Sequence, residues 1–183
     1  TQGVSSAASD VYKRQTDTHA LYTVKEIRQV EQEALANSPS YALMQRAGTA
    51  AGELAYELLQ SSEKEKRVLV LAGPGNNGGD ALEAASQLMN AGLKVCITLP
   101  YASDHLTADA QQALQNAKAS RATFIASNDA SISNTDWALV IDGLFGIGLN
   151  SAITGPAYEL IAAVNQLSCP ILALDVPLSL IHI

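Results

Sequence analysis

The chain has 183 residues, of which 48% are hydrophobic and 16% are charged, a composition that excludes disorder and favours one globular domain. Eleven basic against eighteen acidic residues give a formal net charge of −7, so nucleic acid is not expected as a partner. No apolar stretch approaches the roughly 20 residues that span a bilayer, and no signal sequence is apparent. We therefore expect a cytoplasmic protein that does not enter a membrane.

Both ends of the sequence are expected to be foreign to the domain. One choice of codons for Asp10–Gln15 (DVYKRQ) is the reverse complement of a choice of codons for Leu178–Ile183 (LSLIHI). The N-terminal run is also similar to a translated sequencing-library adapter. Segments 1–15 and 178–183 are therefore set aside as non-native. They leave one domain over residues 16–177, which we expect to be incomplete at its C-terminal end.

Two amphipathic helices are predicted at the start of this domain. Thr23 and Glu26 form a capping box, in which the hydroxyl and the carboxylate each satisfy an N–H group of the first turn, before a helix to about Ala36. Ser40 is predicted to cap a second helix, because apolar residues then recur at spacings of three and four as far as Leu58.

Strands and helices alternate along the rest of the chain. Strands are predicted at Val68–Ala72, Val95–Leu99, Ala122–Ile125, Ala138–Ile141 and Ile171–Leu174, and helices at Ala81–Asn90, Thr107–Lys118 and Pro156–Asn165. Strands of continuous Val, Ile and Leu that alternate with helices are typical of a parallel sheet covered on both faces. The predicted fold class is therefore α/β, with a doubly wound sheet.

Polar residues follow three of the predicted strands. In an open parallel sheet, ligands bind at the carboxyl ends of the strands. The first strand leads into Gly73–Asp80 (GPGNNGGD), and two others end at Asp142 and Asp175. Each acid alone is explained equally well as a turn residue. Two acids and a glycine-rich loop on one rim together favour a ligand site.

The glycine-rich segment Gly73–Asp80 satisfies the GxGxxG pattern between a strand and a helix, with Asp80 placed to cap that helix. The pattern alone is weak, and the acid expected about 20 residues later is missing, which disfavours an ordinary NAD-dependent dehydrogenase. The side-chain oxygens of Asn76, Asn77 and Asp80 suit a hard cation or sugar hydroxyls. A second glycine-rich turn, Asp142–Gly148, either approaches a ligand or forms a tight loop.

These segments, together with Met44–Gly48 (MQRAG) and Leu174–Pro177 (LDVP), resemble the NAD(P)H-hydrate epimerase family over about residues 21–177. The GNNGGD element is the most specific part of the resemblance. The family fold is a Rossmann-like three-layer αβα sandwich with a mostly parallel sheet, commonly in a homodimer. Its members interconvert the R and S forms of hydrated NADH and NADPH (NADHX and NADPHX), so that an ADP/ATP-dependent dehydratase, fused or separate, can restore NAD(P)H.

The resemblance also implies roles for individual residues. Asp175 would act in acid/base chemistry at the hydrated C6 atom, and Asn77 and Asp142 would ligate a potassium ion. The implied substrate-binding residues are Asn76, Asn77, Gly78, Gly79, Asp80, Gly146, Ile147, Gly148, Leu149, Asn150, Ser151, Ala152 and Asp175. The chain departs from the family pattern at Ala81, where Gly is common, and at Leu178, where a serine that helps to hold the cation is expected.

The sequence leaves two other functions open. A non-catalytic binding or scaffold module of the same fold is disfavoured because it has no need for polar groups gathered at one rim. A nucleotide-dependent transferase is weakened by the absence of GxxxxGK[ST]. Among the remaining residues, His19 and His105 are expected to be solvated and Trp137 to pack in the core. Cys96 and Cys169 are expected to be buried free thiols.

Overall fold

The computed structural model describes residues 22–36, 39, 41–102 and 105–176. Ser40, His19 and the two ends predicted to be foreign lie outside these residues. The chain divides into two units, Thr1–Asn37 and Ser38–Ile183.

The described part of the first unit is helix α2, Val24–Ala36. Its capping box forms as predicted. The Thr23 N–H donates to Glu26 Oε2 at 2.7 Å, and the Glu26 N–H donates to Thr23 Oγ1 at 3.3 Å. These bonds lower the pKa of the Glu26 carboxyl. Two N–H groups that the helix itself leaves without a partner are therefore satisfied locally.

The second unit is built on a five-stranded sheet. Its strands are β1 (Arg67–Ala72), β2 (Lys94–Thr98), β3 (Thr123–Ile125), β4 (Leu139–Gly143) and β5 (Ile171–Ala173). Their order across the sheet is β3-β2-β1-β4-β5, and every neighbouring pair is parallel. The predicted parallel sheet is confirmed.

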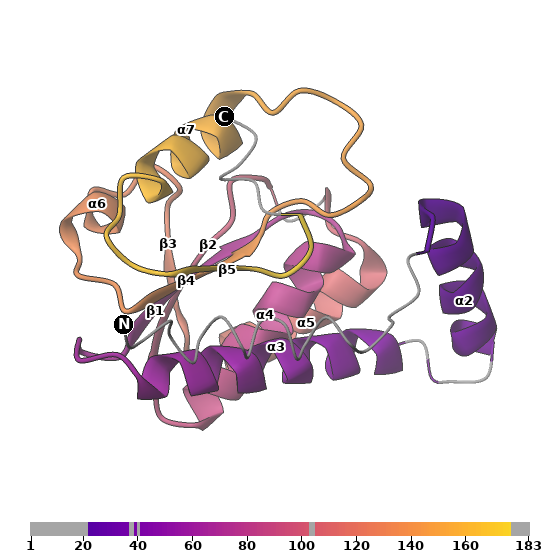
Figure 1. Cartoon of the computed structure of the whole chain (residues 1–183), viewed down its shortest axis with the longest axis horizontal. Coiled ribbons are helices and arrows are strands. Elements are labelled where there is room, and N and C mark those ends of the chain that lie inside the picture. Colours follow the sequence, from indigo (N-terminus) through magenta and orange to yellow (C-terminus); the bar gives the residue numbers. More distant parts are fainter. Residues whose placement is uncertain (1–21, 37–38, 40, 103–104, 177–183) are drawn as a thin grey trace, which may run out of the picture. The chain divides into compact units, whose positions relative to one another are not determined.

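Helices cover both faces of this sheet (Figure 1). One face carries α3 (Ala42–Gln60), α4 (Asn76–Asn90) and α5 (Ala108–Ala119), and the other carries α6 (Ser131–Asn134) and α7 (Gly155–Val164). Alternate residues of a strand point to opposite faces. Val68 and Val70 of β1 accordingly join the apolar cluster under α3, α4 and α5, whereas Leu69 and Leu71 join the cluster under α7. The predicted three-layer αβα sandwich is confirmed.

Helix α4 begins earlier than the sequence predicts. It starts at Asn76 rather than Ala81, with Gly75 at the N-cap position. The prediction that Asp80 caps this helix is therefore wrong, because Asp80 already lies inside it. Tertiary packing explains the difference: Gly78 and Gly79 are buried where a side chain would collide with Gly73 or Met44. Packing of this kind overrides the poor helix propensity of glycine.

Smaller differences occur elsewhere. Tyr41, rather than Ser40, occupies the N-cap position of α3, and its side chain makes no capping bond. The short helix α6 lies in a segment predicted to be a loop, and the Asp129 carboxylate accepts a hydrogen bond from the Ser131 N–H at its start at 2.8 Å. Asp and Ser at such positions favour a local turn.

The single-residue predictions are mostly confirmed. Trp137 is 3% exposed in the apolar cluster under α7, and its indole N–H donates to the Ile132 carbonyl at 2.8 Å. His105 is exposed. Cys96 and Cys169 are free, as predicted, but both are only partly buried, so the prediction of buried thiols was too strong.

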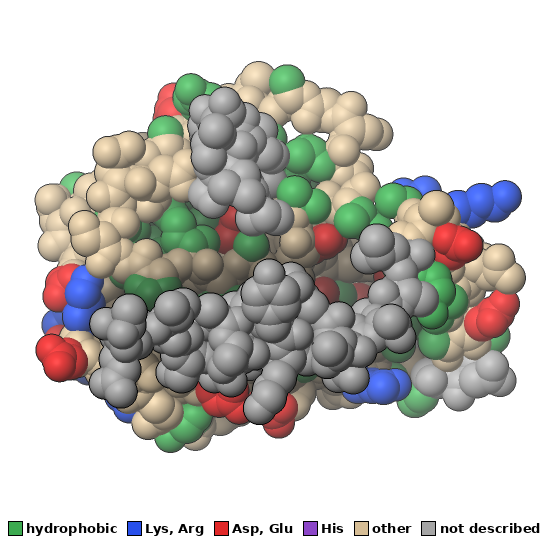
Figure 2. Space-filling view, in the orientation of Figure 1, with side chains coloured by type: hydrophobic (Ala, Val, Ile, Leu, Met, Phe, Trp, Pro, Cys, Tyr) green, Lys and Arg blue, Asp and Glu red, His purple; other side chains and the backbone are tan. Residues whose placement is uncertain are grey.

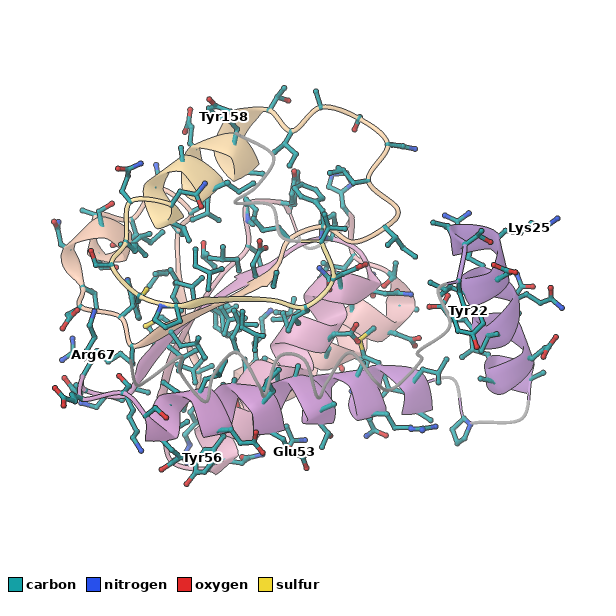
Figure 3. All side chains as sticks on the ribbon, in the orientation of Figure 1. Tyr22, Lys25, Glu53, Tyr56, Arg67 and Tyr158 are labelled. Carbon is teal, nitrogen blue, oxygen red and sulfur yellow. The ribbon has the colours of Figure 1, made fainter. Side chains whose placement is uncertain are left out.

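Charged side chains pair with one another at the amino edge of the sheet. Glu65, just before β1, accepts from Arg67 at 2.6 Å and from Lys94 at 2.5 Å, the first residues of β1 and β2. Basic and acidic atoms lie side by side at the left of Figure 2, where Figure 3 labels Arg67. Exposed pairs of this kind contribute little to stability, because water and salt screen them. Among the described helices, none is long and apolar enough to cross a membrane.

Candidate functional site

The strand order places a topological switch point at the carboxyl ends of β1 and β4. The chain leaves β1 toward α4 on one face of the sheet and leaves β4 toward α7 on the other (Figure 1). Such a topological switch point is where open parallel sheets bind ligands. Leu71 pairs with Asp142 across the two strands, and the Gly73 N–H donates to the Gly143 carbonyl at 3.1 Å. The two glycine-rich segments therefore lie side by side.

Close backbone approach makes glycine necessary at two positions of the first segment. A Cβ atom at Gly73 would collide with the backbone of Leu144, and one at Gly78 would collide with the backbone of Gly73. Neither obstacle is a flexible side chain that could move aside. The glycines hold the start of α4 against the ends of β1 and β4. The first N–H groups of α4, which have no partner within the helix, therefore lie at this rim.

Asn77 connects the first turn of α4 to the loop after β4. Its side-chain nitrogen donates to the carbonyl oxygen of Phe145 at 2.8 Å. This bond fixes which end of the amide is the donor, so the side-chain oxygen Oδ1 is the end left to accept a hydrogen bond or to ligate a cation. The contact joins residues 68 positions apart in the chain.

Asn76 makes a comparable connection to the start of α5. Its side-chain oxygen accepts a hydrogen bond from the Thr107 hydroxyl at 3.1 Å. The N–H of Thr107 donates to the Pro74 carbonyl at 3.2 Å, and Thr107 also caps α5. Three loops that follow β1, β2 and β4 are thus bonded to one another around the first turn of α4. Sequence reasoning did not identify Thr107 or Phe145 as part of this site.

Asp142 is a buried carboxylate near the carboxyl end of β4. It is 5% exposed, and its Oδ1 accepts a hydrogen bond from the Leu144 N–H at 3.1 Å. A buried carboxylate is costly unless hydrogen bonds or a cation compensate for its lost hydration. In the described part of the chain, no group of three or more His, Cys, Asp or Glu side chains could hold a metal. Asn77, whose side chain is bonded to the loop that follows Asp142, adds an amide oxygen to this part of the rim.

Asp175 lies two residues after β5 on the exposed side of the same rim. Its Oδ2 accepts a hydrogen bond from the Ile147 N–H at 2.8 Å. A Cβ atom at Gly146 would collide with this carboxylate, so glycine is needed there to let the acid reach the loop. Backbone N–H groups form strong, charge-assisted bonds to carboxylates. The loop after β4 therefore fixes the position of Asp175.

The remaining predicted binding residues divide between buried and exposed positions. Gly79 is packed against Met44 and Ala110, and its N–H is bonded within the helix to the Gly75 carbonyl at 3.1 Å. Asp80 lies further along the helix and is partly exposed. The next loop residues precede α7, and all are exposed except Leu149, which is partly buried: Gly148, Leu149, Asn150, Ser151 and Ala152.

Two aromatic rings meet at this rim, and sequence reasoning did not find them. Tyr101 follows β2 and Phe145 follows β4, and their ring centroids are 6.0 Å apart at an interplanar angle of 74°. This edge-to-face arrangement is favourable for aromatic pairs. Burial raises the pKa of the Tyr101 hydroxyl.

A doubly wound α/β sheet with a glycine-rich helix start and two carboxylates at its switch point defines a ligand-binding α/β protein. Residues 40–180 match the family model described as the YjeF-related protein N-terminus. The chain belongs to this family.

Individual relatives agree with this assignment. The chain is 44% identical to a protein of Bordetella pertussis named NAD(P)H-hydrate epimerase. The 154 aligned residues cover 84% of this chain and 64% of the relative. A protein of Achromobacter xylosoxidans with the same name is 40% identical over 156 residues, or 85% of this chain and 71% of the relative. A Coxiella burnetii protein named bifunctional NAD(P)H-hydrate repair enzyme Nnr is 35% identical, over 86% of this chain and 31% of the relative.

The chain thus spans a little under two thirds of the length of the Bordetella relative. A solved structure also shares the fold: the crystal structure of yeast ynu0 superposes with a TM-score of 0.73, at 22% identity, over 87% of this chain and 71% of that one. At this level of identity, the likeness concerns the fold alone.

Proposed function

We propose that this chain epimerises hydrated NADH and NADPH, interconverting the R and S forms of NADHX and NADPHX. The relatives from Bordetella and Achromobacter carry the name of this activity. The observation that carries the proposal is the position of Asp175, which is held by the Ile147 N–H at the rim where Asn77 and Asp142 also lie. An isomerase of this kind needs a proton-transfer group beside a site for an anionic dinucleotide.

The start of α4 supports binding of the dinucleotide. A helix N-terminus offers unpaired N–H groups and a partial positive charge to phosphate. This local field compensates for the overall charge of −7, which would otherwise repel an anion. In the proposed complex, residues Asn76–Asp80 contact the substrate, and the loop Gly146–Ala152 lines its phosphate or ribose side.

A potassium ion is part of the proposal. Asn77 and Asp142 are its proposed ligands, and the site suits it because Asn77 presents an amide oxygen while Asp142 presents a buried carboxylate. Oxygen ligands are those that hard cations prefer. When bound, the ion would supply a fixed positive charge that compensates Asp142 and attracts substrate oxygens.

Asp175 is the proposed catalytic residue. Inversion at C6 can proceed by departure and re-addition of the hydroxyl group or by opening and closing of the ring. In either route, a proton must be delivered to an oxygen or nitrogen atom and later removed, which a carboxylate at the reacting centre can do. The Ile147 N–H holds one oxygen of Asp175 in place. The other oxygen is then available for the substrate.

We further propose that the active protein is a cytoplasmic homodimer. Its S product would pass to an ADP/ATP-dependent dehydratase, either fused or separate, since the Coxiella relative is named a bifunctional repair enzyme. Size-exclusion chromatography with light scattering tests the dimer, and a molar mass near 19.2 kDa would contradict it.

Turnover of purified (R)-NADHX, followed by chromatography in potassium and then in sodium, tests the epimerase proposal. We expect conversion to the S form that needs potassium and that falls by at least about 100-fold in Asp175→Asn. The matched control is Asp136→Asn, which removes an acid paired with Lys64 at the opposite edge of the sheet and should retain activity. A folded protein that binds the dinucleotide without converting it would instead support a non-catalytic binding module.

A further inference from the structure

The aromatic pair at the rim has no part in the proton transfer or the cation site described above. Tyr101 and Phe145 come from the loops after β2 and β4, and both are partly exposed. Their rings meet edge to face. In this geometry the ring that presents its edge leaves both of its faces uncovered by its partner. The pair therefore retains aromatic surface that another planar ring can cover.

Hydrogen bonds of the same loops place this pair beside the proposed catalytic groups. The carbonyl of Phe145 accepts from the Asn77 side chain at 2.8 Å. Ile147, two residues further on, donates to Asp175 at 2.8 Å. The Tyr101 loop continues to Thr107, which donates to Asn76 at 3.1 Å. The two rings thus extend from the same loops that fix both ends of the polar site.

We propose that Tyr101 and Phe145 form a stacking wall for an unsaturated nitrogen heterocycle of the substrate. The inference rests on the proposed function and names two further binding residues for it. Planar bases stack on aromatic side chains regardless of their hydrogen-bonding pattern. A tyrosine hydroxyl is protonated at neutral pH, and burial raises the pKa of the Tyr101 hydroxyl further. The ring therefore adds no negative charge next to an anionic ligand.

Two parts of the dinucleotide offer this chemistry, namely the hydrated nicotinamide ring and the adenine ring. Competition by AMP and by reduced nicotinamide mononucleotide distinguishes them. Calorimetric titration with each mononucleotide gives an affinity that does not depend on turnover. Removal of the wall should weaken binding of only the mononucleotide whose base it contacts.

The test compares Tyr101→Leu and Phe145→Leu with Tyr101→Phe, which keeps the ring. We expect each leucine variant to raise KM for NADHX about tenfold, with kcat changed less than about twofold, and Tyr101→Phe to match the parent protein. A rise in KM alone reports lost binding that is equal in the ground and transition states. A variant that merely disturbed the Asp175 loop would lower kcat instead.

Tyr56→Leu is the matched control, because Tyr56 is an exposed tyrosine on α3, in the lower part of Figure 3. It should leave both constants and both mononucleotide affinities unchanged. Thermal melts of all variants establish that they fold.

The outcomes separate this inference from the proposed function. In one outcome, the parent protein converts NADHX, and both leucine variants keep the KM and the mononucleotide affinities of the parent. This result overturns the wall and leaves the epimerase proposal standing. Mononucleotide affinity that falls in the leucine variants supports the wall even if the parent protein converts no NADHX, a result that removes only the epimerase proposal. A parent protein that binds neither mononucleotide, and whose KM for NADHX does not rise in the leucine variants, overturns the wall.

Discussion

Gly78 has no side chain, and this allows the start of α4 to pack directly against the end of β1 at the site. An alanine there would place its Cβ against the backbone of Gly73, and backbone cannot move aside without displacing the end of β1 or the start of α4. We expect Gly78→Ala to lower the free energy of unfolding by about 1–3 kcal/mol, measured by urea denaturation, and to weaken dinucleotide binding.

Gly75→Ala is its matched control, since an added methyl group at Gly75 meets nothing within 4 Å and its φ is −93°. Its cost should be limited to that of a poorer N-cap residue, at most about 1 kcal/mol. Equal losses of stability in the two variants would contradict the close-approach explanation.

Thr98 is the opposite case, a polar side chain that the fold does not use. Its side chain is fully buried at the end of β2, and in the described structure its hydroxyl has no hydrogen-bond partner. An unpaired buried hydroxyl costs free energy, whereas valine has nearly the same shape without that cost. Thr98→Val should therefore raise the free energy of unfolding by about 1 kcal/mol, measured by urea denaturation. A clear loss of stability would show that the hydroxyl is satisfied.

At the scale of secondary-structure elements, a buried polar cluster joins three helices. Glu83 of α4 is 6% exposed, and its Oε2 accepts hydrogen bonds from the Tyr41 hydroxyl at 2.6 Å and from the Asn116 side chain at 3.3 Å. Tyr41 precedes α3, and Asn116 belongs to α5. A Cβ atom at Gly48 would collide with Glu83, so α3 and α4 are also closely packed here. The cluster specifies how these helices meet around the start of α4.

Tyr41→Phe tests this cluster through its pH dependence. Burial first, and then the hydrogen bond and negative charge of Glu83, raise the pKa of the Tyr41 hydroxyl. A group whose pKa is raised in the folded state stabilises fully below its unfolded pKa, here about 10, and loses that contribution as pH rises further. The parent protein should exceed the variant in stability by about 1–3 kcal/mol at neutral pH, with a difference that shrinks from about pH 9 to pH 11. A difference that stays constant over this range would contradict the explanation.

The elements show which parts of the fold the sequence could predict. The strands are continuous runs of aliphatic residues, so their positions and parallel arrangement follow from the pattern alone. The start of α4 does not follow, because Asn-Asn-Gly-Gly favours a turn locally and becomes helical only through packing against Gly73 and Met44. The two acids were found by the rule that strand ends converge. The hydrogen bonds that shape the site are long-range. The bond from Asn77 to Phe145 joins residues 68 positions apart, and the bond from Ile147 to Asp175 joins residues 28 positions apart. At such separations, the spacing of residues in the sequence does not predict which side chains meet.

At the scale of the whole molecule, binding of the proposed cation and substrate is coupled to folding. Their site exists only when β1, β4 and β5 are assembled in the sheet. The bond between Asn77 and Phe145 joins the loop after β1 to the loop after β4, 68 positions apart in the chain. An unfolded chain therefore cannot present the same oxygen ligands to a cation. A ligand that binds only the folded state stabilises it by RT ln(1 + [L]/Kd). Potassium at about ten times its Kd should therefore raise the free energy of unfolding by about 1.4 kcal/mol relative to sodium at the same ionic strength.

Urea denaturation of the parent protein in each salt measures this effect, and Asn77→Ala should abolish it, because the variant loses both the amide oxygen and the bond to Phe145. The matched control is Asn90→Ala, at the exposed far end of the same helix, which should keep the full response to potassium. Stabilisation that persists in Asn77→Ala would place the cation elsewhere. Equal stability of the parent protein in the two salts would remove potassium from the proposed site and leave Asp142 to be compensated by hydrogen bonds alone.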